Sequence, residues 1–251
     1  MCGVFQYNTQ HTERIYHTVL HIVQERNVFC FMLGYLLGGQ FDLFTLLIMV
    51  TIYMVIAFVV FPARGFAQAY IANQLGDPTA RFSGRMTMNP RAHIDLFGTI
   101  ILFVCGIGFV KPVPMNPHNF RKPRTGIILT ALAGPVMGVL MGAIGIAIYR
   151  ICLMFIKDYQ LLSFLQLTLV QIFALTNIRL AVFTLLPLPF LDGYTILSLF
   201  LPPRWVYFIQ SNSMYATLLV LILIFSGAVD YPVSFLSNLI LNGIGFLFGF
   251  H

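Results

Sequence analysis

Four residues near the N-terminus have the types and spacing of a metal site. Glu13, His17, His21 and Glu25 recur every four residues, so a helix would carry all four side chains on one face. Imidazole and carboxylate groups arranged in this way can bind zinc. No glutamate follows His17, however, so the pair of histidines lacks an adjacent general base. The same spacing is typical of an amphipathic surface helix, and we expect that role rather than metal binding.

A second set of polar residues lies within apolar sequence. Arg64 and Gln68 are one helical turn apart at the end of an apolar run, while Arg179 and Asp192 interrupt or follow a later one. A lone arginine or aspartate at membrane depth costs at least ~2.5 to 3.5 kcal/mol on insertion scales, so each is expected to have a partner or to reach the interface. Arg179 has no evident partner in the sequence, and we expect it to face another subunit or a lipid head group.

Composition identifies the class of protein that must position these residues. Hydrophobic residues make up 59% of the chain, charged residues 9%, and mean hydropathy is +0.87, values that exclude a soluble globular domain. We predict an all-α multi-pass membrane protein. Residues 42–251 are expected to form the transmembrane domain, and residues 1–41 are expected to form an N-terminal segment that is amphipathic and contains a short hydrophobic stretch. The four cysteines have no paired spacing and are predicted to be free thiols.

Apolar runs of about 20 residues, the length of a spanning helix, predict five transmembrane helices. The runs are residues 43–61, 126–149, 161–178 with a continuation to 191, 205–229 and 231–250. A sixth, shorter run at 96–110 is glycine-rich and is either a tilted span or a re-entrant segment buried among the others. The alternation in residues 84–90 favours an edge strand, so we expect a short strand or re-entrant region near residues 84–117.

The net charge of +6 comes largely from loops beside these runs, at residues 81–91 and 111–124. This pattern follows the positive-inside rule and does not indicate a nucleic-acid partner. It places both loops and the C-terminus on the cytoplasmic side of a bacterial inner membrane or an organellar membrane. The expected partners are lipid and other transmembrane proteins or subunits of a membrane complex.

Several stretches together resemble the site-2 protease family of intramembrane zinc metalloproteases, in its small bacterial-type branch without a PDZ domain. The resemblance covers roughly residues 43–247. It rests on Phe-Ala-Gln-Ala-Tyr-Ile-Ala-Asn at 66–73, Leu-Gly-Asp-Pro-Thr-Ala at 75–80, the 84–95 segment, the proline-rich loop at 111–120, Ala-Leu-Ala-Gly-Pro at 131–135 and Leu-Leu-Pro-Leu-Pro-Phe-Leu-Asp-Gly at 185–193. The family's turn at Ala92-His93-Ile94-Asp95 implies a structural hydrogen bond for His93 rather than ligation, and we expect the same of His118.

The resemblance implies where a catalytic site would lie. Active relatives have a His-Glu-x-x-His helix at positions 64–68, with a distant aspartate as third zinc ligand. Here Arg64, Gly65 and Gln68 replace the two histidines and the glutamate, and Asp192 matches the aspartate. A guanidinium has no free lone pair for a cation, so the resemblance implies a family member without catalytic residues, zinc or other cofactor.

Two further positions depart from the family pattern, because Gly138 and Thr184 stand where relatives have asparagine. Family geometry would also bring Arg64 opposite Asp192. We therefore predict that an Arg64–Asp192 ion pair, with bidentate geometry and a bond from Gln68, replaces the metal. The alternative is that Arg64 extends to the cytoplasmic interface.

Three functions are compatible with these residues. The first is a pseudoprotease that binds or sequesters transmembrane partners, using the glycine-rich helix of residues 133–145 for close approach. Packing inside the protein is the alternative role of those glycines. The second function is a structural or accessory subunit of a larger membrane complex. The third is an active intramembrane metalloprotease with a rearranged metal site.

Overall fold

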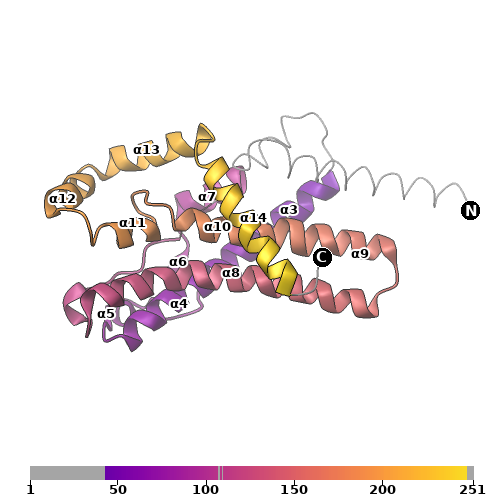
Figure 1. The fold of residues 1–251 in the computed structure, drawn as a ribbon, viewed down its shortest axis with the longest axis horizontal. Helices are drawn as coiled ribbons and strands as arrows, with labels where there is room; N and C mark the ends of the chain where they lie inside the picture. The colour runs from indigo at the N-terminus through magenta and orange to yellow at the C-terminus, as the bar shows by residue number, and fades with distance from the viewer. Residues whose placement is uncertain (1–42, 107, 109, 248–251) are drawn as a thin grey trace, which may run out of the picture.

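The computed structural model describes residues 43–106, 108 and 110–247, and the regular elements within these residues are all helical. In chain order they are α3 (Leu43–Val55), η2 (Ile56–Val60), α4 (Phe61–Gln74), α5 (Thr79–Phe82), α6 (Pro90–His93), α7 (Leu96–Cys105), η3 (Pro117–Asn119), α8 (Pro123–Phe155), α9 (Tyr159–Leu165), η4 (Gln166–Ala174), α10 (Leu175–Thr184), α11 (Asp192–Leu197), α12 (Pro203–Ser211), α13 (Ser213–Phe225) and α14 (Asp230–Leu247). Figure 1 shows α8 as the long central helix of this arrangement, with α4 along it. The N-terminal stripe of Glu13, His17, His21 and Glu25 lies outside the described residues.

Three helices are long and apolar enough to cross a membrane: Leu46–Gln74, Pro123–Phe155 and Tyr159–Thr184. A fourth span results if α12 and α13 are counted together, but the two are bent by 84°. The bend follows Asn212, whose side-chain amide donates to the carbonyl oxygen of Phe208 and ends α12. Within the described residues, the prediction of a membrane protein is therefore confirmed, with three or four candidate spans instead of five to six.

The segment from 96 to 110 does not cross the membrane as one helix. α7 has ten residues, about 15 Å at 1.5 Å per residue, which is half the thickness of a bilayer core. It begins after the Asp95 cap, whose carboxylate accepts from Gly98 N–H at 2.9 Å, and ends at Gly106 with a φ of 73°. The Lys111 N–H then bonds the carbonyl oxygen of His93 at 3.0 Å. The chain thus returns to the place it left, as the re-entrant alternative predicts.

The predicted edge strand at 84–90 is wrong. Residues 84–89 form turns and irregular loop, Pro90 begins α6, and no strand occurs among the described residues of the 84–117 region. The physical reason is that the hydrogen-bonding groups of Arg85 find partners in nearby loops and helices instead of in a neighbouring strand. The Arg85 N–H bonds Ala80, and the Arg85 guanidinium donates to the carbonyl oxygens of Ala92 and Pro112. Among the described residues, one backbone hydrogen bond joins the 84–95 segment to the 110–117 segment, from Lys111 to His93. A pair of strands would need a ladder of several such bonds.

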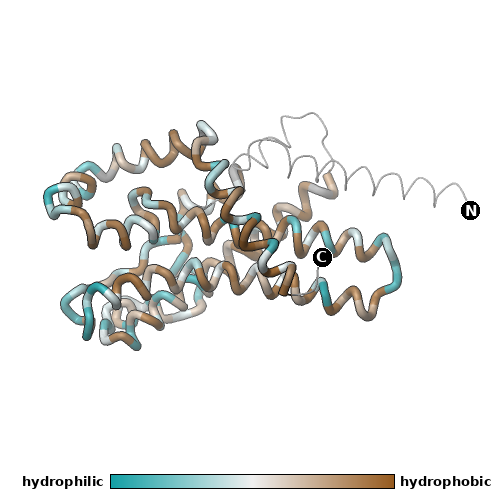
Figure 2. Tube along the Cα trace, viewed as in Figure 1, coloured by the Kyte–Doolittle hydropathy of each residue, from teal (hydrophilic) through white to brown (hydrophobic). Residues whose placement is uncertain are grey.

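Two π-helical segments adjust the faces of the long helices. In η2 the Phe61 N–H bonds the carbonyl oxygen of Ile56, five residues earlier, and the inserted residue rotates the rest of the helix. The main apolar core packs around η2. Its buried members come from α3, η2, α4, α7, η4, α10, α13 and α14, and from Leu191 and Val229 just before α11 and α14. Figure 2 shows hydrophobic residues along the helices and hydrophilic ones near both ends of α8, around α5 and between α8 and α9. The π insertion in η2 sets which face of α4 turns inward.

The glycines of α8 serve internal packing. A Cβ on Gly138 would lie 3.2 Å from the Ala181 side chain, and one on Gly142 would lie 3.0 Å from Ile178. A Cβ on Gly145 would meet Phe173 at 2.8 Å. Bare backbone on this face lets α8 approach α10 and η4 closely. The alternative of internal packing is therefore confirmed for these glycines.

Arg179 has neighbours inside the chain, which corrects the expectation that it faces another subunit or lipid. It lies in α10 and interacts electrostatically with Tyr53 of α3 and Asp230 at the start of α14. The interaction links three helices that are distant in sequence. The local sequence could not reveal it, because Asp230 follows Arg179 by about fifty residues.

Candidate functional site

A cavity of about 70 Å³ lies where α4, α8, α10 and α11 meet the irregular segment 110–115. Its lining mixes apolar residues with a few convergent polar groups, the composition typical of a ligand site. The lining residues are Arg64, Gln68, Val110, Lys111, Pro112, Val113, Met115, Thr130, Thr184, Phe190, Leu191, Asp192 and Thr195. Four of the positions singled out in the sequence, Arg64, Gln68, Thr184 and Asp192, are thus brought together.

α4 presents Arg64 and Gln68 on one face. Pro62 lies just after η2 within the continuous helix Leu46–Gln74, and its missing N–H falls where the π-helical segment passes into α4. Four residues separate Arg64 from Gln68, so both side chains point to the same side. Arg64 is only 2% exposed, which makes it one of the largest fully buried side chains of the described residues. It therefore does not extend to an interface, and that alternative is wrong.

Asp192 reaches the cavity because the backbone before it folds tightly. A Cβ on Gly193 would lie 2.1 Å from the Leu185 carbonyl oxygen and 2.4 Å from that of Leu186, so a side chain could not fit there. Phe190 has a φ of 70°, a left-handed conformation that is rare for a bulky residue. A strained residue of this kind persists only where the surrounding structure fixes its conformation, and such residues cluster at functional sites. Together they set the first residue of α11 above α4.

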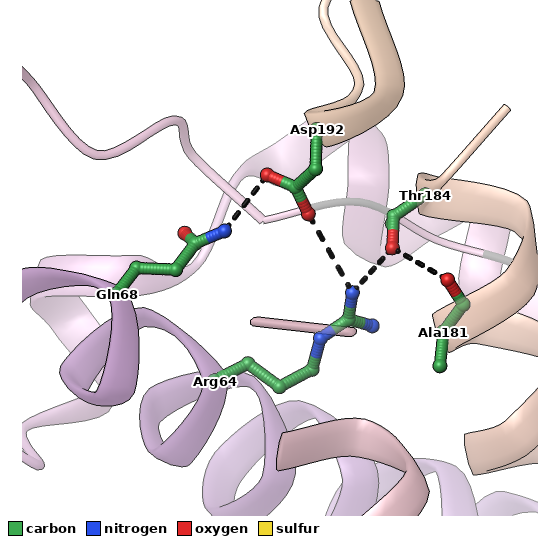
Figure 3. Close-up of polar contacts among 5 residues, drawn as sticks. All are labelled: Arg64, Gln68, Ala181, Thr184 and Asp192. Atoms are coloured by element: carbon green, nitrogen blue, oxygen red, sulfur yellow. Dashed lines mark hydrogen bonds and ion pairs between the residues drawn. The ribbon is translucent and has the colours of Figure 1, made fainter. Parts of the chain in front are cut away.

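The polar contacts form a short chain across the cavity (Figure 3). Gln68 Nε2 donates to Asp192 Oδ1 at 2.8 Å, and Arg64 Nη2 donates to Thr184 Oγ1 at 2.7 Å. The Thr184 hydroxyl in turn donates to the Ala181 carbonyl oxygen at 3.1 Å. The charges of Arg64 and Asp192 approach to 3.9 Å, between Nη2 and Oδ2.

The predicted ion pair thus forms, but the predicted bidentate geometry is wrong. A separation of 3.9 Å is a charge contact and too long for a hydrogen bond. Thr184 takes the hydrogen bond instead, because its hydroxyl comes from α10 directly beside the guanidinium. The Gln68 bond to Asp192 agrees with the prediction.

Several buried donors of the residues that line this cavity have no partner among the described residues. Arg64 Nε and Nη1 and Thr130 Oγ1 are buried without a hydrogen bond. A guanidinium has five N–H donors, and leaving a buried polar group unsatisfied costs about 1–3 kcal/mol. The site is therefore under-satisfied on its cationic side.

Gly65 is in contact with His93. A Cβ on Gly65 would lie 2.1 Å from His93 Nδ1 and 2.7 Å from Cε1, so the imidazole occupies the space of a side chain at position 65. His93 itself is fully buried and its Nε2 lies 2.8 Å from the Thr87 carbonyl oxygen. A carbonyl can only accept, so Nε2 carries the proton and Nδ1 is a free lone pair.

The predicted structural hydrogen bond of His93 is confirmed. Burial lowers the pKa of His93 below its ordinary value, the bond to the Thr87 carbonyl opposes this, and the positive charge of Arg85 lowers it further. The imidazole is therefore neutral at pH 7. Because Nδ1 faces the glycine, His93 acts as a spacer beside α4.

The donor set of this cavity does not fit a catalytic zinc ion. Such an ion takes three protein ligands chosen from histidine, cysteine and carboxylate side chains. The cavity offers one carboxylate and one amide oxygen, beside a cation that would repel the metal. Elsewhere in the described part of the chain, no three His, Cys, Asp or Glu side chains are grouped to hold a metal ion.

Two predicted positions are not part of the cavity lining. Gly138 lies against Ala181 at the contact between α8 and α10. His118 is an exposed residue of η3 whose backbone N–H bonds the Asn116 side chain. Cys152 is a free thiol, as predicted for the cysteines.

Thr130, Lys111 and the positive φ of Phe190 are features of the site that were not predicted from the sequence. Thr130 had no distinguishing signal, since a threonine in an apolar helix usually bonds its own backbone. Lys111 is part of the proline-rich loop, where it could be counted only as a loop charge. The contact between Gly65 and His93 was likewise invisible, because almost thirty residues separate them.

Comparison with known proteins identifies a relative of this chain. No protein-family model and no solved structure matches the chain. The chain is 40% identical over 155 residues to a Bacillus subtilis (strain 168) protein named "Putative zinc metalloprotease YwhC". The match covers 60% of this chain and 70% of that protein. A similarity of that extent and degree shows common ancestry, so the chain belongs to the site-2-protease-like family of membrane zinc metalloproteases.

Proposed function

We propose that this chain is a catalytically inactive member of its family, a pseudoprotease that binds or sequesters transmembrane partners. The observation that carries the proposal is the cluster of Arg64, Gln68 and Asp192, in which a buried cation approaches the carboxylate expected to bind zinc. The Arg64 guanidinium, 3.9 Å from that carboxylate, supplies the positive charge that a zinc ion would otherwise supply. With Gly65 at the position of the general base, the chain has no group there to activate water.

His93 supports the same proposal. Its imidazole fills the space beside Gly65, so a glutamate at position 65 would need the ring to move. Reversal of the proposed loss therefore requires the His93 ring to move, in addition to the substitutions at positions 64, 65 and 68. The partner-binding part of the proposal rests on the cavity, which remains open among α4, α8 and α11 and is lined by groups with unused hydrogen-bonding capacity.

The test begins with zinc content, measured by mass spectrometry on the full chain purified in detergent. Wild type is compared with a restored variant carrying Arg64→His, Gly65→Glu, Gln68→His and His93→Ala. A matched control adds Asp192→Ala to the restored variant and so removes the third ligand. We expect no zinc in wild type, about one ion per chain in the restored variant, and loss of that ion in the control.

Stoichiometric zinc in wild type would overturn the proposal. If that zinc also survived Asp192→Ala, His17 and His21 would become the candidate ligands of an active enzyme. Cleavage of a membrane substrate by wild type would have the same consequence.

Partner binding is tested by co-reconstitution with single-span membrane proteins. Exchangeable capture, reversed by an excess of a second single-span protein, is the expected result. Co-purification of fixed partners in equal amounts, without exchange, would instead support a structural subunit of a larger complex.

A further inference from the structure

We propose that the cavity above Arg64 is a binding site for a carboxylate group. This inference rests on the proposed binding role and deepens it, since it names the chemistry that a partner would present. It does not depend on whether the chain cleaves that partner. The site belongs to this chain's own residues, because the cation that defines it stands where the family resemblance implies a histidine.

The first step is the state of the Arg64 guanidinium. The side chain is 98% buried, so water outside the protein does not solvate it. One nitrogen, Nη2, donates to Thr184, while Nε and Nη1 have no partner among the described residues. Asp192 balances part of the charge at 3.9 Å without accepting a hydrogen bond from Arg64. A planar donor group with free N–H bonds is therefore held in place.

The second step is the charge of the space beside it. Two cations, Arg64 and Lys111, line the cavity with a single carboxylate, Asp192, so its lining is positive by one charge when all three are ionised. Gln68 already donates to Asp192, so that carboxylate has less capacity left to accept hydrogen bonds from Arg64. An anion entering the cavity would restore neutrality.

The third step is shape. A cavity of about 70 Å³ holds a few non-hydrogen atoms, the size of an acetate or of the end of an acidic side chain. The fork of a guanidinium can donate to a planar carboxylate through two parallel N–H bonds. Thr130 contributes a hydroxyl that also has no partner among the described residues and lines the same cavity. Each edge of the guanidinium pairs Nη2 with either Nε or Nη1, so one carboxylate can accept from one of these edges.

The probe is sodium acetate, with acetamide as a neutral molecule of the same shape. The melting temperature of the full chain in detergent is followed by circular dichroism at 222 nm, at constant ionic strength set by sodium methanesulfonate. A ligand that binds the folded state raises this temperature with its concentration. We expect acetate to raise it and acetamide to leave it unchanged.

Variants of the ion pair make the test specific. Asp192→Asn removes the competing negative charge and is expected to strengthen acetate binding about tenfold. The double variant Arg64→Gln/Asp192→Asn keeps a neutral, similarly sized pair and is expected to abolish it. Arg204→Gln, which removes an exposed arginine outside the cavity, is the control with the same loss of charge as Arg64→Gln and should bind acetate like wild type.

The source of the carboxylate is resolved by a second probe. Single-span peptides with one aspartate in the apolar segment are compared with the same peptides carrying asparagine. Capture of the aspartate peptide in preference identifies a side chain of a membrane partner, and equal capture together with acetate binding identifies a free small acid. Absence of an acetate effect in both wild type and Asp192→Asn would overturn the inference. The zinc measurement would be unaffected by that result.

Discussion

Two carboxylates, the buried Asp77 and the partly buried Asp192, show how differently this protein treats the same group. Asp77 is fully buried and accepts from the backbone N–H groups of Thr79 and Asn116 at 3.1 and 2.7 Å. The Thr79 hydroxyl and the Asn119 amide also donate to it, the latter at 3.0 Å. Asp192 accepts from the Gln68 amide at 2.8 Å, receives no backbone N–H bond within the described residues, and has a side chain that is a quarter exposed.

Asp77 is therefore a structural carboxylate, whereas Asp192 remains available for a further interaction. Asp77 ties the turn after α4 to the loop at 116–119, and its acceptor capacity is used within the fold. Asp192 and Arg64 face a cavity with hydrogen bonds still to be made. A saturated polar group holds a fold together, whereas an under-satisfied one beside a cavity is suited to a ligand.

Replacement of Asp77 should have the largest effect. Asp77→Ala leaves four donors without their acceptor, and we expect it to lower the free energy of unfolding by about 4 kcal/mol. The measurement is unfolding by SDS titration in mixed micelles. Asp158→Ala is the control, since that carboxylate accepts a single backbone bond in an exposed cap and should cost about 1 kcal/mol. Equal effects of the two variants would remove the distinction between a structural and an available carboxylate.

Breaking the Arg64–Asp192 pair should rank next. Arg64→Leu leaves Asp192 without its counter-charge and is expected to lower the free energy of unfolding by about 3 kcal/mol. Replacing both residues with leucine should bring stability back to within about 1 kcal/mol of wild type, because no charge is then left unpaired. The same SDS titration measures both. A double variant as unstable as the single one would show that the pair holds the helices together by itself.

A side chain at position 65 should have a smaller effect. Gly65→Ala forces the His93 ring to shift, and we expect a loss of about 2 kcal/mol. Gly243→Ala is the matched control, since nothing lies within 4 Å of a Cβ there and the helix should gain up to about 1 kcal/mol. His93→Ala should relieve the Gly65→Ala penalty in a double-mutant cycle. Additive losses would argue against the contact.

The smallest expected effect is a dependence of stability on acid. Burial raises the pKa of Asp77, but the hydrogen bonds from Thr79, Asn116 and Asn119 outweigh it and leave the pKa below its ordinary value. A carboxyl group with a lower pKa in the folded state stabilises the fold above about pH 4, the unfolded value, and this contribution is lost as pH falls through the folded pKa. Melting temperature measured from pH 6 to pH 2 should therefore fall more steeply in wild type than in Asp77→Asn. Parallel curves would contradict the assignment.

Much of the architecture could be predicted from local sequence. Hydrophobic composition and run length depend on transfer energies, which are properties of individual residues, so the membrane class followed directly. The count of spans was wrong, because the bend of 84° between α12 and α13 falls at Gln-Ser-Asn-Ser of residues 210–213, inside the stretch counted as one span. The strand at 84–90 failed for a related reason. Alternation favours a strand only if a partner is present, and here the Arg85 side chain bonds the neighbouring carbonyls instead.

The sequence by itself determined that Arg64 and Asp192 need partners, because isolated charges are costly in an apolar setting. It also determined which positions match the pattern of the family. Only the tertiary structure decided that Thr184 takes the hydrogen bond, that the two charges stop at 3.9 Å and that His93 occupies the space at Gly65. These outcomes depend on shifts of an ångström between helices that are distant in sequence. Such shifts are set by packing, and no local pattern encodes them.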